Sequence, residues 1–200
     1  MESEAPEEKL LSLSVKTNAL DYLERAAMFV SETSENVRAW KWVVISLHGA
    51  LYGFAVAVTK GTDDETVLNK KGKLLGFWEV LKMCQDPNHM SMLRHSKHLE
   101  LTKQQEESIS RLTNLLRNRF EHFVPTSWSI EIHGLPQITI DILEVIRFLA
   151  LETGTFLYMK EEEEALVDKL VRETIEFIKG TELYAEMLRG QELYKKEEST

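Results

Sequence analysis

The chain has 200 residues, 43% of them hydrophobic and 28% charged, so it is long enough to bury the core of one globular domain. Its 9 glycines and 4 prolines are few, which excludes fibrous and disordered classes and favours a helix-rich protein. The formal net charge of −9 argues against a general affinity for nucleic acid, although Lys and Arg residues gather in the middle third and leave room for a local basic surface.

The cysteine count and the N-terminus indicate where the protein works. A single cysteine, Cys84, excludes an internal disulfide and is typical of a reducing cytoplasm. Residues 1–9 are acidic and contain no apolar run, so no signal peptide is expected. The most apolar stretch, Val43 to Val58, is interrupted by polar residues and is shorter than the roughly 20 residues of a membrane span. We therefore expect a soluble cytoplasmic protein without membrane contact.

The N-terminal half contains an acidic lead-in and then helices. Residues 1–13 are expected to be a flexible acidic segment, and a first helix is predicted over about 16–33. A second helix is predicted over about 37–60, where apolar residues run nearly all the way round, as in a central helix. A polar connection then leads to a short helix at about 74–84 and a loop around Asp86-Pro87-Asn88. Residues 89–101 are ambiguous between a short helix and a loop.

A fourth main helix is predicted over about 102–123, ended by Pro125. Apolar and polar residues alternate from Trp128 to Ile132, and Gly134-Leu135-Pro136 forms a turn. Two readings of this stretch stay open: a short β-hairpin, whose second strand would contain Ile138 and Ile140, or an extended loop.

Two further helices, over about 139–151 and 161–179, complete the predicted domain. The helical domain is expected to span residues 14–189 and to be followed by a charged C-terminal tail, 190–200. The expected fold is therefore all-α, a helical bundle of about five to six helices with a possible short hairpin after the fourth.

The fourth helix carries the candidate site. On a wheel at about 100° per residue, an apolar stripe contains Ile109, Leu112, Leu115, Leu116, Phe120 and Phe123. Arg119 falls inside this stripe, where its stem can lie along apolar surface. Arg117 and Glu121 share the polar side as an i, i+4 pair worth about 0.3–0.5 kcal/mol, and Asn118 and His122 share a face in the same way.

Arg117 and His122 are five residues apart and diverge by about 140° around the helix. They cannot point at one atom within an isolated helix. They can flank a substrate that lies along the helix, or converge with the same residues of a symmetry-related second helix in a dimer.

The pattern Arg117-Asn118-x-x-x-His122 near a helix end, in a small all-α domain, resembles the R-x4-6-H signature of HEPN domains. A polar residue often follows the arginine in that superfamily, as Asn118 does here. The resemblance covers about residues 16–179, and the continuation from His122 to Pro125 and at Trp128-Ser129-Ile130 is similar to bacterial members. Toxin-type members often carry a tyrosine two residues after the histidine, whereas this chain has Val124.

The resemblance implies a metal-independent endoribonuclease with no cofactor, whose Arg/His site is completed at a homodimer interface. His122 would transfer a proton, Arg117 would hold phosphate oxygens, and Asn118 would orient His122 or bind phosphate or ribose. Arg111, Asn114 and Arg119 would bind the RNA. The implied partners are RNA rather than DNA, a second copy, and a neutralising protein of the toxin–antitoxin or phage-defence kind. The alternative is a noncatalytic HEPN-like module that binds a nucleotide or a protein partner.

Other residues receive less functional interpretations. His48, inside an apolar helix, is expected to be a hydrogen-bonded core residue. His89, His95 and His98 lack the H-E-x-x-H pattern, so no metal site is expected there. Most of the tryptophans have apolar neighbours and are expected to pack in the core or in a dimer interface: Trp40, Trp42, Trp78 and Trp128.

Overall fold

The computed structural model describes residues 9–93, 96–122, 125–154 and 159–197. Within these ranges the regular elements are helices, and the one β-type pairing is an isolated bridge between Leu68 and Leu74. The predicted all-α class is confirmed. In chain order the elements are α1 (Val15–Glu32), α2 (Ala39–Lys60), η1 (Asp64–Val67), α3 (Phe77–Gln85), α4 (Pro87–Met92), α5 (Lys103–Ser110), η2 (Arg111–Arg117), α6 (Asn118–Glu121), α7 (Leu135–Leu151), α8 (Glu161–Lys179) and α9 (Glu182–Glu197).

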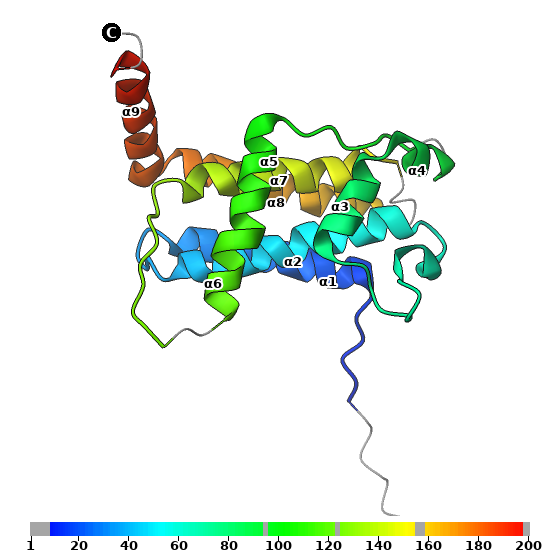
Figure 1. Cartoon of the computed structure of the whole chain (residues 1–200). Coiled ribbons are helices and arrows are strands. Elements are labelled where there is room, and N and C mark those ends of the chain that lie inside the picture. The colour runs from blue at the N-terminus through cyan, green and yellow to red at the C-terminus, as the bar shows by residue number, and fades with distance from the viewer. Residues whose placement is uncertain (1–8, 94–95, 123–124, 155–158, 198–200) are drawn as a thin grey trace, which may run out of the picture.

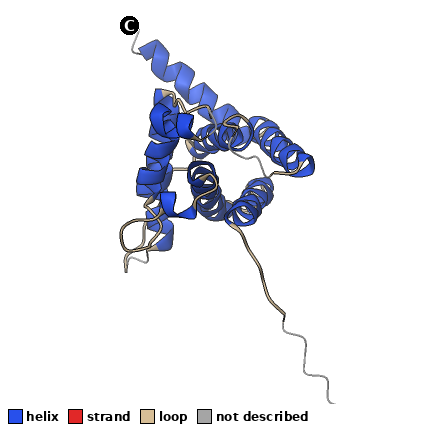
Figure 2. Ribbon diagram, turned by 90° about the vertical axis from the view of Figure 1, so that its right-hand side faces the viewer, coloured by secondary structure: helices blue, strands red, loops and turns tan. Residues whose placement is uncertain are grey.

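Four long helices form a closed ring of neighbours around the core. Helix α1 packs on α2 and α8, and α7 packs on the same two helices from the other side. Figure 2 looks along these helices, and Figure 1 shows them side by side. Two glycines of α2 let α1 approach closely, because a Cβ at Gly49 would lie 2.6 Å from the Tyr22 ring and one at Gly53 would lie 2.8 Å from Ala19 Cβ.

Helix α2 is the central helix of the fold. By length and composition it is apolar enough to cross a membrane, with a mean hydropathy of 1.6, but 61% of that apolar window is buried inside the fold. Its buried side chains include Leu47, Leu51 and Phe54, each with no exposed surface. Burying such side chains is the main stabilising term in a fold of this kind, so α2 is a core helix, as predicted.

Caps and ion pairs set the ends of the ring helices. Ser14 begins α1 by accepting a hydrogen bond from the backbone N–H of Thr17 at 3.1 Å. Lys16 of α1 contacts Glu163 of α8 at 2.7 Å, and the hydrogen bond from Lys16 lowers the pKa of that carboxyl. Helix α8 runs from Glu161 to Lys179, the bounds predicted from the sequence.

The predicted hairpin is not formed within the described residues 125–134, which contain no strand. Helix α7 begins at Leu135, with Pro136 in its first turn, so Ile138 and Ile140 are buried in a helix. Proline suits this position because its missing N–H would be unpaired at a helix start. The stretch Gly134-Leu135-Pro136 was interpreted as a turn of a hairpin or of an extended loop, with the next helix from about Thr139, whereas α7 already begins at Leu135.

Two other helices were not predicted. Asp86 does not lie in a loop but caps α4, accepting a hydrogen bond from the backbone N–H of Asn88 at 2.9 Å. Helix α9 runs through the stretch read as a charged tail, and Figure 1 shows it projecting from the bundle. Of the predicted N-terminal segment, residues 1–8 lie outside the described residues and 9–14 form no helix or strand.

Candidate functional site

The predicted motif lies at the end of one continuous helical rod, formed by α5, η2 and α6, which crosses the long helices in Figure 1. Thr102 caps the start of this rod. The carboxylate of Asp141, buried on α7, accepts a hydrogen bond from Ser108 Oγ at 2.5 Å. It also accepts one from each of Gln104 and Gln137, at 3.0 and 2.8 Å. This buried network anchors the rod on α7 just before the motif begins.

The middle of the rod, η2, is a π-helix. Its i→i+5 hydrogen bonds make each residue turn by less than in an α-helix, so the wheel used for the prediction fails here. Leu115, predicted in the apolar stripe, is 40% exposed, whereas Thr113 is buried. Three members of the stripe are buried as predicted: Ile109, Leu112 and Leu116.

Arg117, the last residue of the π segment, is half-buried against the body of the domain. Its Nη2 contacts Glu121 Oε2 at 2.6 Å, which confirms the predicted pair, and its Nη1 donates to Asn118 Oδ1 at 3.2 Å. Its Nε is buried without a hydrogen-bond partner among the described residues. Arg117 is therefore turned further inward than the wheel predicted.

His122 follows α6 in extended backbone, with φ −100° and ψ 116°, and its side chain is exposed. The amide of Asn118 does not orient it, since Asn118 Nδ2 donates to the carbonyl of Asn114 at 3.2 Å. Arg117 and His122 open onto different hollows of the surface. Within one chain the structure does not bring the two motif residues together.

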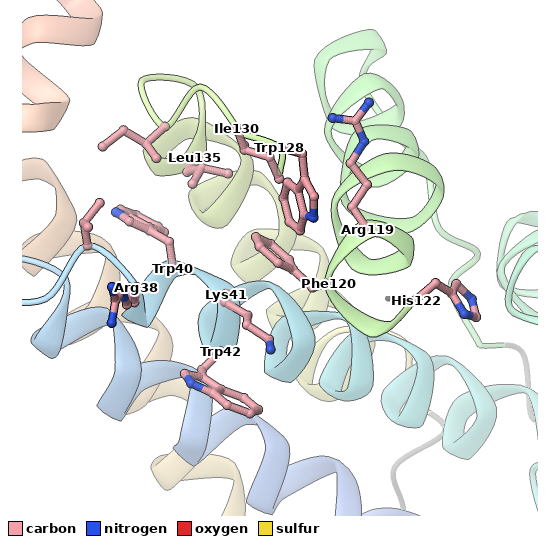
Figure 3. A pocket seen from close by; sticks show the side chains of 12 residues that line it. Arg38, Trp40, Lys41, Trp42, Arg119, Phe120, His122, Trp128, Ile130 and Leu135 are labelled. Atoms are coloured by element: carbon pink, nitrogen blue, oxygen red, sulfur yellow. The ribbon is translucent and has the colours of Figure 1, made fainter. Parts of the chain in front are cut away.

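The first hollow, which we call the tryptophan groove, has a volume of about 640 Å³. It lies between the start of α2, the end of α6 and the segment before α7 (Figure 3). Among the four tryptophans, Trp40 is in the core, with 5% of its surface exposed, whereas Trp42, Trp78 and Trp128 are 47%, 43% and 41% exposed. Packing of these three in a dimer interface stays a prediction. The complete lining is Val37, Arg38, Trp40, Lys41, Trp42, Arg119, Phe120, His122, Trp128, Ile130, Ile132 and Leu135.

All the charged side chains that line the tryptophan groove are positive. Arg38, Lys41 and Arg119 line it, and no carboxylate does. None of these three cations has an acidic partner within 4.0 Å in the part of the chain that the structure describes. Lys41 instead lies 4.9 Å from the centre of the Trp42 ring. On a protein of net charge −9, the groove is thus a local concentration of positive charge beside aromatic and apolar surface.

The second hollow, which we call the His48 pocket, has a volume of about 730 Å³. It lies between α1, α2, η1 and the rod, and both His48 and Arg117 line it. His48 is half-buried, and its ring lies 5.1 Å from that of Phe77, centroid to centroid. Burial, and to a lesser extent the charge of Arg117, lowers the pKa of His48 to about 4. The imidazole is therefore neutral at pH 7.

The prediction that His48 is a hydrogen-bonded core residue is wrong. No hydrogen bond or ion pair of its ring is found among the described residues, and the ring faces a pocket. The error has a local cause: the residues on either side of His48 in the sequence are apolar, but its ring lines a hollow that segments distant in sequence, among them η1 and the rod, complete.

The other predicted site residues lie apart from both hollows, except Arg119. Arg111 is exposed and its Nη1 lies 3.3 Å from the position of a Cβ built on Gly134. Asn114 accepts a hydrogen bond from Trp78 Nε1 at 3.2 Å on the outer face of the rod. Arg119 projects from α6 at the edge of the tryptophan groove, and Figure 3 shows it and His122 pointing in different directions.

The cations and tryptophans at the start of α2 carried a signal that the sequence interpretation did not use. Arg38-Ala39-Trp40-Lys41-Trp42 interleaves two cations with two aromatic rings, a pattern typical of single-stranded nucleic acid sites. It was read as core because apolar residues follow it. In the structure Trp42 is 47% exposed, and both cations line the groove with it.

No group of three His, Cys, Asp or Glu side chains that could hold a metal ion gathers in the described ranges. His89 Nε2 lies 3.1 Å from the carbonyl of Thr59, and His98 contacts Glu100 at 3.0 Å. His95 and Phe123, which the sequence predictions included, lie outside the described residues. Cys84 is buried, and burial raises the pKa of its thiol to about 12, so it is unreactive in the folded protein.

Comparison with protein-family models, with curated proteins and with solved structures finds no match to this chain.

Proposed function

We propose that the chain is a metal-independent endoribonuclease that acts as a homodimer on single-stranded RNA. The observation that carries the proposal is the tryptophan groove. Three cations, which have no acidic partner in the described part of the chain, and three tryptophans surround one hollow that reaches His122. Aromatic rings stack on bases without demanding a sequence, and the cations neutralise phosphates. Such a groove fits a single strand better than a duplex, whose bases are stacked inside.

The residue types suit RNA cleavage without a metal. The 2′-oxygen attacks the neighbouring phosphorus, a 2′,3′-cyclic phosphate forms, and the bond from phosphorus to the 5′-oxygen breaks. A base must take the proton of the 2′-hydroxyl and an acid must give one to the leaving oxygen. His122 performs one of these transfers, and Arg117 holds the phosphate through its planar fork, as the resemblance to HEPN domains implies.

The separation of Arg117 from His122 makes the site a two-chain site. Because the two side chains open onto different hollows, each active centre combines Arg117 of one protomer with the partner subunit's His122. The outer face of the rod offers a surface for the second copy, since Leu115 and Trp78 are 40% and 43% exposed and lie beside Asn114. Exposed apolar side chains at one place are typical of an interface.

The test is cleavage of a fluorescent single-stranded RNA in the presence of EDTA. We expect His122→Ala to lose cleavage while its helical circular dichroism stays that of the wild type. His133→Ala is the matched control, because His133 is an exposed histidine outside both hollows, and it should cleave normally. Equal cleavage by wild type and His122→Ala would contradict the proposal.

A noncatalytic module is the second candidate. The pairing of Arg117 with Glu121 at 2.6 Å favours it, since a neutralised arginine is a weaker phosphate ligand. In that case the wild type is inert towards RNA in EDTA, yet its melting temperature rises when a nucleotide or a protein partner binds. A cytoplasmic location fits either candidate and is part of the proposal, as is a neutralising partner protein.

A further inference from the structure

We infer that His48 is the second proton-transfer residue, and that each active centre consists of His48 and Arg117 of one protomer together with the partner subunit's His122. This inference rests on the proposed function and places the reaction in the His48 pocket. Its volume of about 730 Å³ lies within the range of roughly 300–1,000 Å³ that small-molecule and nucleotide sites occupy.

The imidazole of His48 is held in place by neighbouring aromatic rings, but its nitrogens form no hydrogen bond among the described residues. Its ring packs against Phe77, at 5.1 Å between centroids, and near Tyr52, at 6.4 Å. The Tyr52 hydroxyl donates to the carbonyl of Leu75, which holds that ring in place as well. Because no ring nitrogen of His48 is hydrogen-bonded within the described residues, a nitrogen remains able to accept a proton from a ligand in the pocket.

The π segment brings Arg117 to this pocket. A regular α-helix would direct Arg117 to the polar side of the rod, whereas the smaller turn of η2 buries its Nε. Thr113 Oγ1, in the same segment, is also buried without a partner, so two polar atoms are left unpaired where the helix departs from α geometry. Buried polar atoms without a partner destabilise a fold, and π-helical segments occur frequently at functional sites.

The charged groups around His48 come from three elements and cancel in pairs. Arg117 on the rod is paired with Glu121, and Lys60 on α2 is paired with Asp64 of η1. The other titratable groups of the pocket are the tyrosines Tyr22 and Tyr52. His48 is therefore the one basic group of the pocket, among the described residues, that is not engaged by a carboxylate.

The neutral state of His48 suits a general base. Burial and Arg117 keep the imidazole unprotonated at pH 7, with a pKa of about 4. A phosphate that binds Arg117 brings negative charge next to the imidazole and offsets the charge of the arginine, the smaller of the two causes that lower the pKa of His48.

These three groups account for every bond and proton in the cleavage step. A His48 nitrogen takes the proton of the 2′-hydroxyl as the 2′-oxygen bonds to phosphorus. The bond between phosphorus and the 5′-oxygen breaks, and the protonated His122 of the partner subunit gives its proton to that oxygen. Arg117 contacts the two non-bridging oxygens and stabilises the charge that develops on them.

The first experiment compares His48→Gln and His48→Phe with wild type in the EDTA cleavage assay. Gln keeps a polar group and Phe keeps the ring packing, but neither accepts a proton, so we expect cleavage to fall about 10²–10⁴-fold. The affinity for an uncleavable 2′-deoxy substituted strand and the melting temperature should stay close to those of wild type for at least one variant. His89→Gln is the matched control, because His89 is also half-buried but lies outside both hollows.

The second experiment tests from which chain each histidine acts. His48→Gln and His122→Ala chains, carrying different tags, are co-expressed and the mixed dimer is isolated. One of its two centres then holds an intact His48 and Arg117 with an intact His122 from the other chain, so we expect about half of wild-type cleavage. If both histidines acted from the same chain, neither centre would be complete and the mixed dimer would be inactive.

The outcomes separate the inference from the proposed function. Wild-type cleavage by both His48 variants together with loss in His122→Ala overturns the role of His48 alone. An inactive mixed dimer overturns the shared centre, as does a chain that stays monomeric at assay concentration. A wild type that does not cleave RNA overturns the proposed function, and the role of His48 with it.

Discussion

The tryptophan groove and the His48 pocket lie on two sides of the same rod, and their polar groups are organised in opposite ways. In the groove the cations Arg38, Lys41 and Arg119 have no acidic partner among the described residues. In the pocket each cation is paired with a carboxylate, and a neutral imidazole is left over. Unpaired cations beside aromatic rings attract a strand, whereas a neutral base beside a paired arginine suits proton transfer.

The comparison explains what the five-residue spacing of Arg117 and His122 does: it places one motif residue in each hollow. The end of α6 separates the two hollows, with one motif residue on each side. In the proposed dimer, a strand held in the groove of one protomer passes His122, and the proposed chemistry takes place where a second protomer presents Arg117 and His48. Binding and reaction are thus divided between two surfaces, which mutations can separate.

The largest expected effect is on the chemistry of the His48 pocket. Arg117→Lys keeps the charge but loses the planar fork that contacts two phosphate oxygens, so cleavage should fall about 10²–10³-fold. RNA affinity should change much less, because the groove is intact. Cleavage rates under single-turnover conditions and affinities for a 2′-deoxy substituted strand check this. Arg172→Lys, at an exposed position of α8 outside both hollows, is the control and should behave as wild type.

A second effect concerns stability rather than cleavage. His48 has a pKa of about 4 in the folded protein against 6.5 for the ordinary side chain. Between these values the unfolded chain binds more protons, so the folded state loses stability as the pH falls from 6.5 to 4, by about 3 kcal/mol. Above pH 6.5 and below pH 4 this group contributes no further change.

His48→Phe isolates that contribution, because it removes the titrating group and keeps the ring packing. Urea unfolding of both proteins at pH 7 and at pH 4.5 should show wild type losing stability relative to the variant. A difference between the two proteins that is the same at both pH values would show that the imidazole is not buried as described.

The smallest expected effect is on the tryptophan groove. Trp42→Ala should weaken binding of single-stranded RNA by about 1–3 kcal/mol, with the rate at saturating RNA nearly unchanged. Phe177→Ala removes an aromatic ring of similar exposure, 39%, from α8 outside the groove and should leave the affinity unchanged. If both variants bind equally well, the groove is not the strand-binding surface.

Arg119→Ala should in addition make RNA binding less dependent on salt. The slope of log affinity against log salt concentration should fall by about the amount that one phosphate contact contributes.

Much of the scaffold was predictable because helix signals are local. Helix α8 was predicted with its observed bounds from its acidic first turn and Gly180, and α2 was identified as the central helix from its all-round apolar pattern. Local patterns gave a wrong prediction where the same residue type is common in two kinds of structure. Pro136 fits a turn as well as a helix start, and only the packing of α7 on α2 and α8 decides between them.

By itself, the sequence determined that the protein is all-α and that Arg117 lies in a helix. It placed His122 on the same helix, diverging from Arg117, whereas in the structure His122 lies just beyond the end of α6 in extended backbone. These properties depend on neighbours in the chain and on helical geometry. The tertiary structure alone decided that the π segment turns Arg117 inward, that His48 lines a pocket, and that Trp42 and Trp128 are exposed beside unpaired cations. Whether a helix face is covered depends on segments distant in sequence, so burial, and with it the pKa of His48, could not be derived from the local pattern.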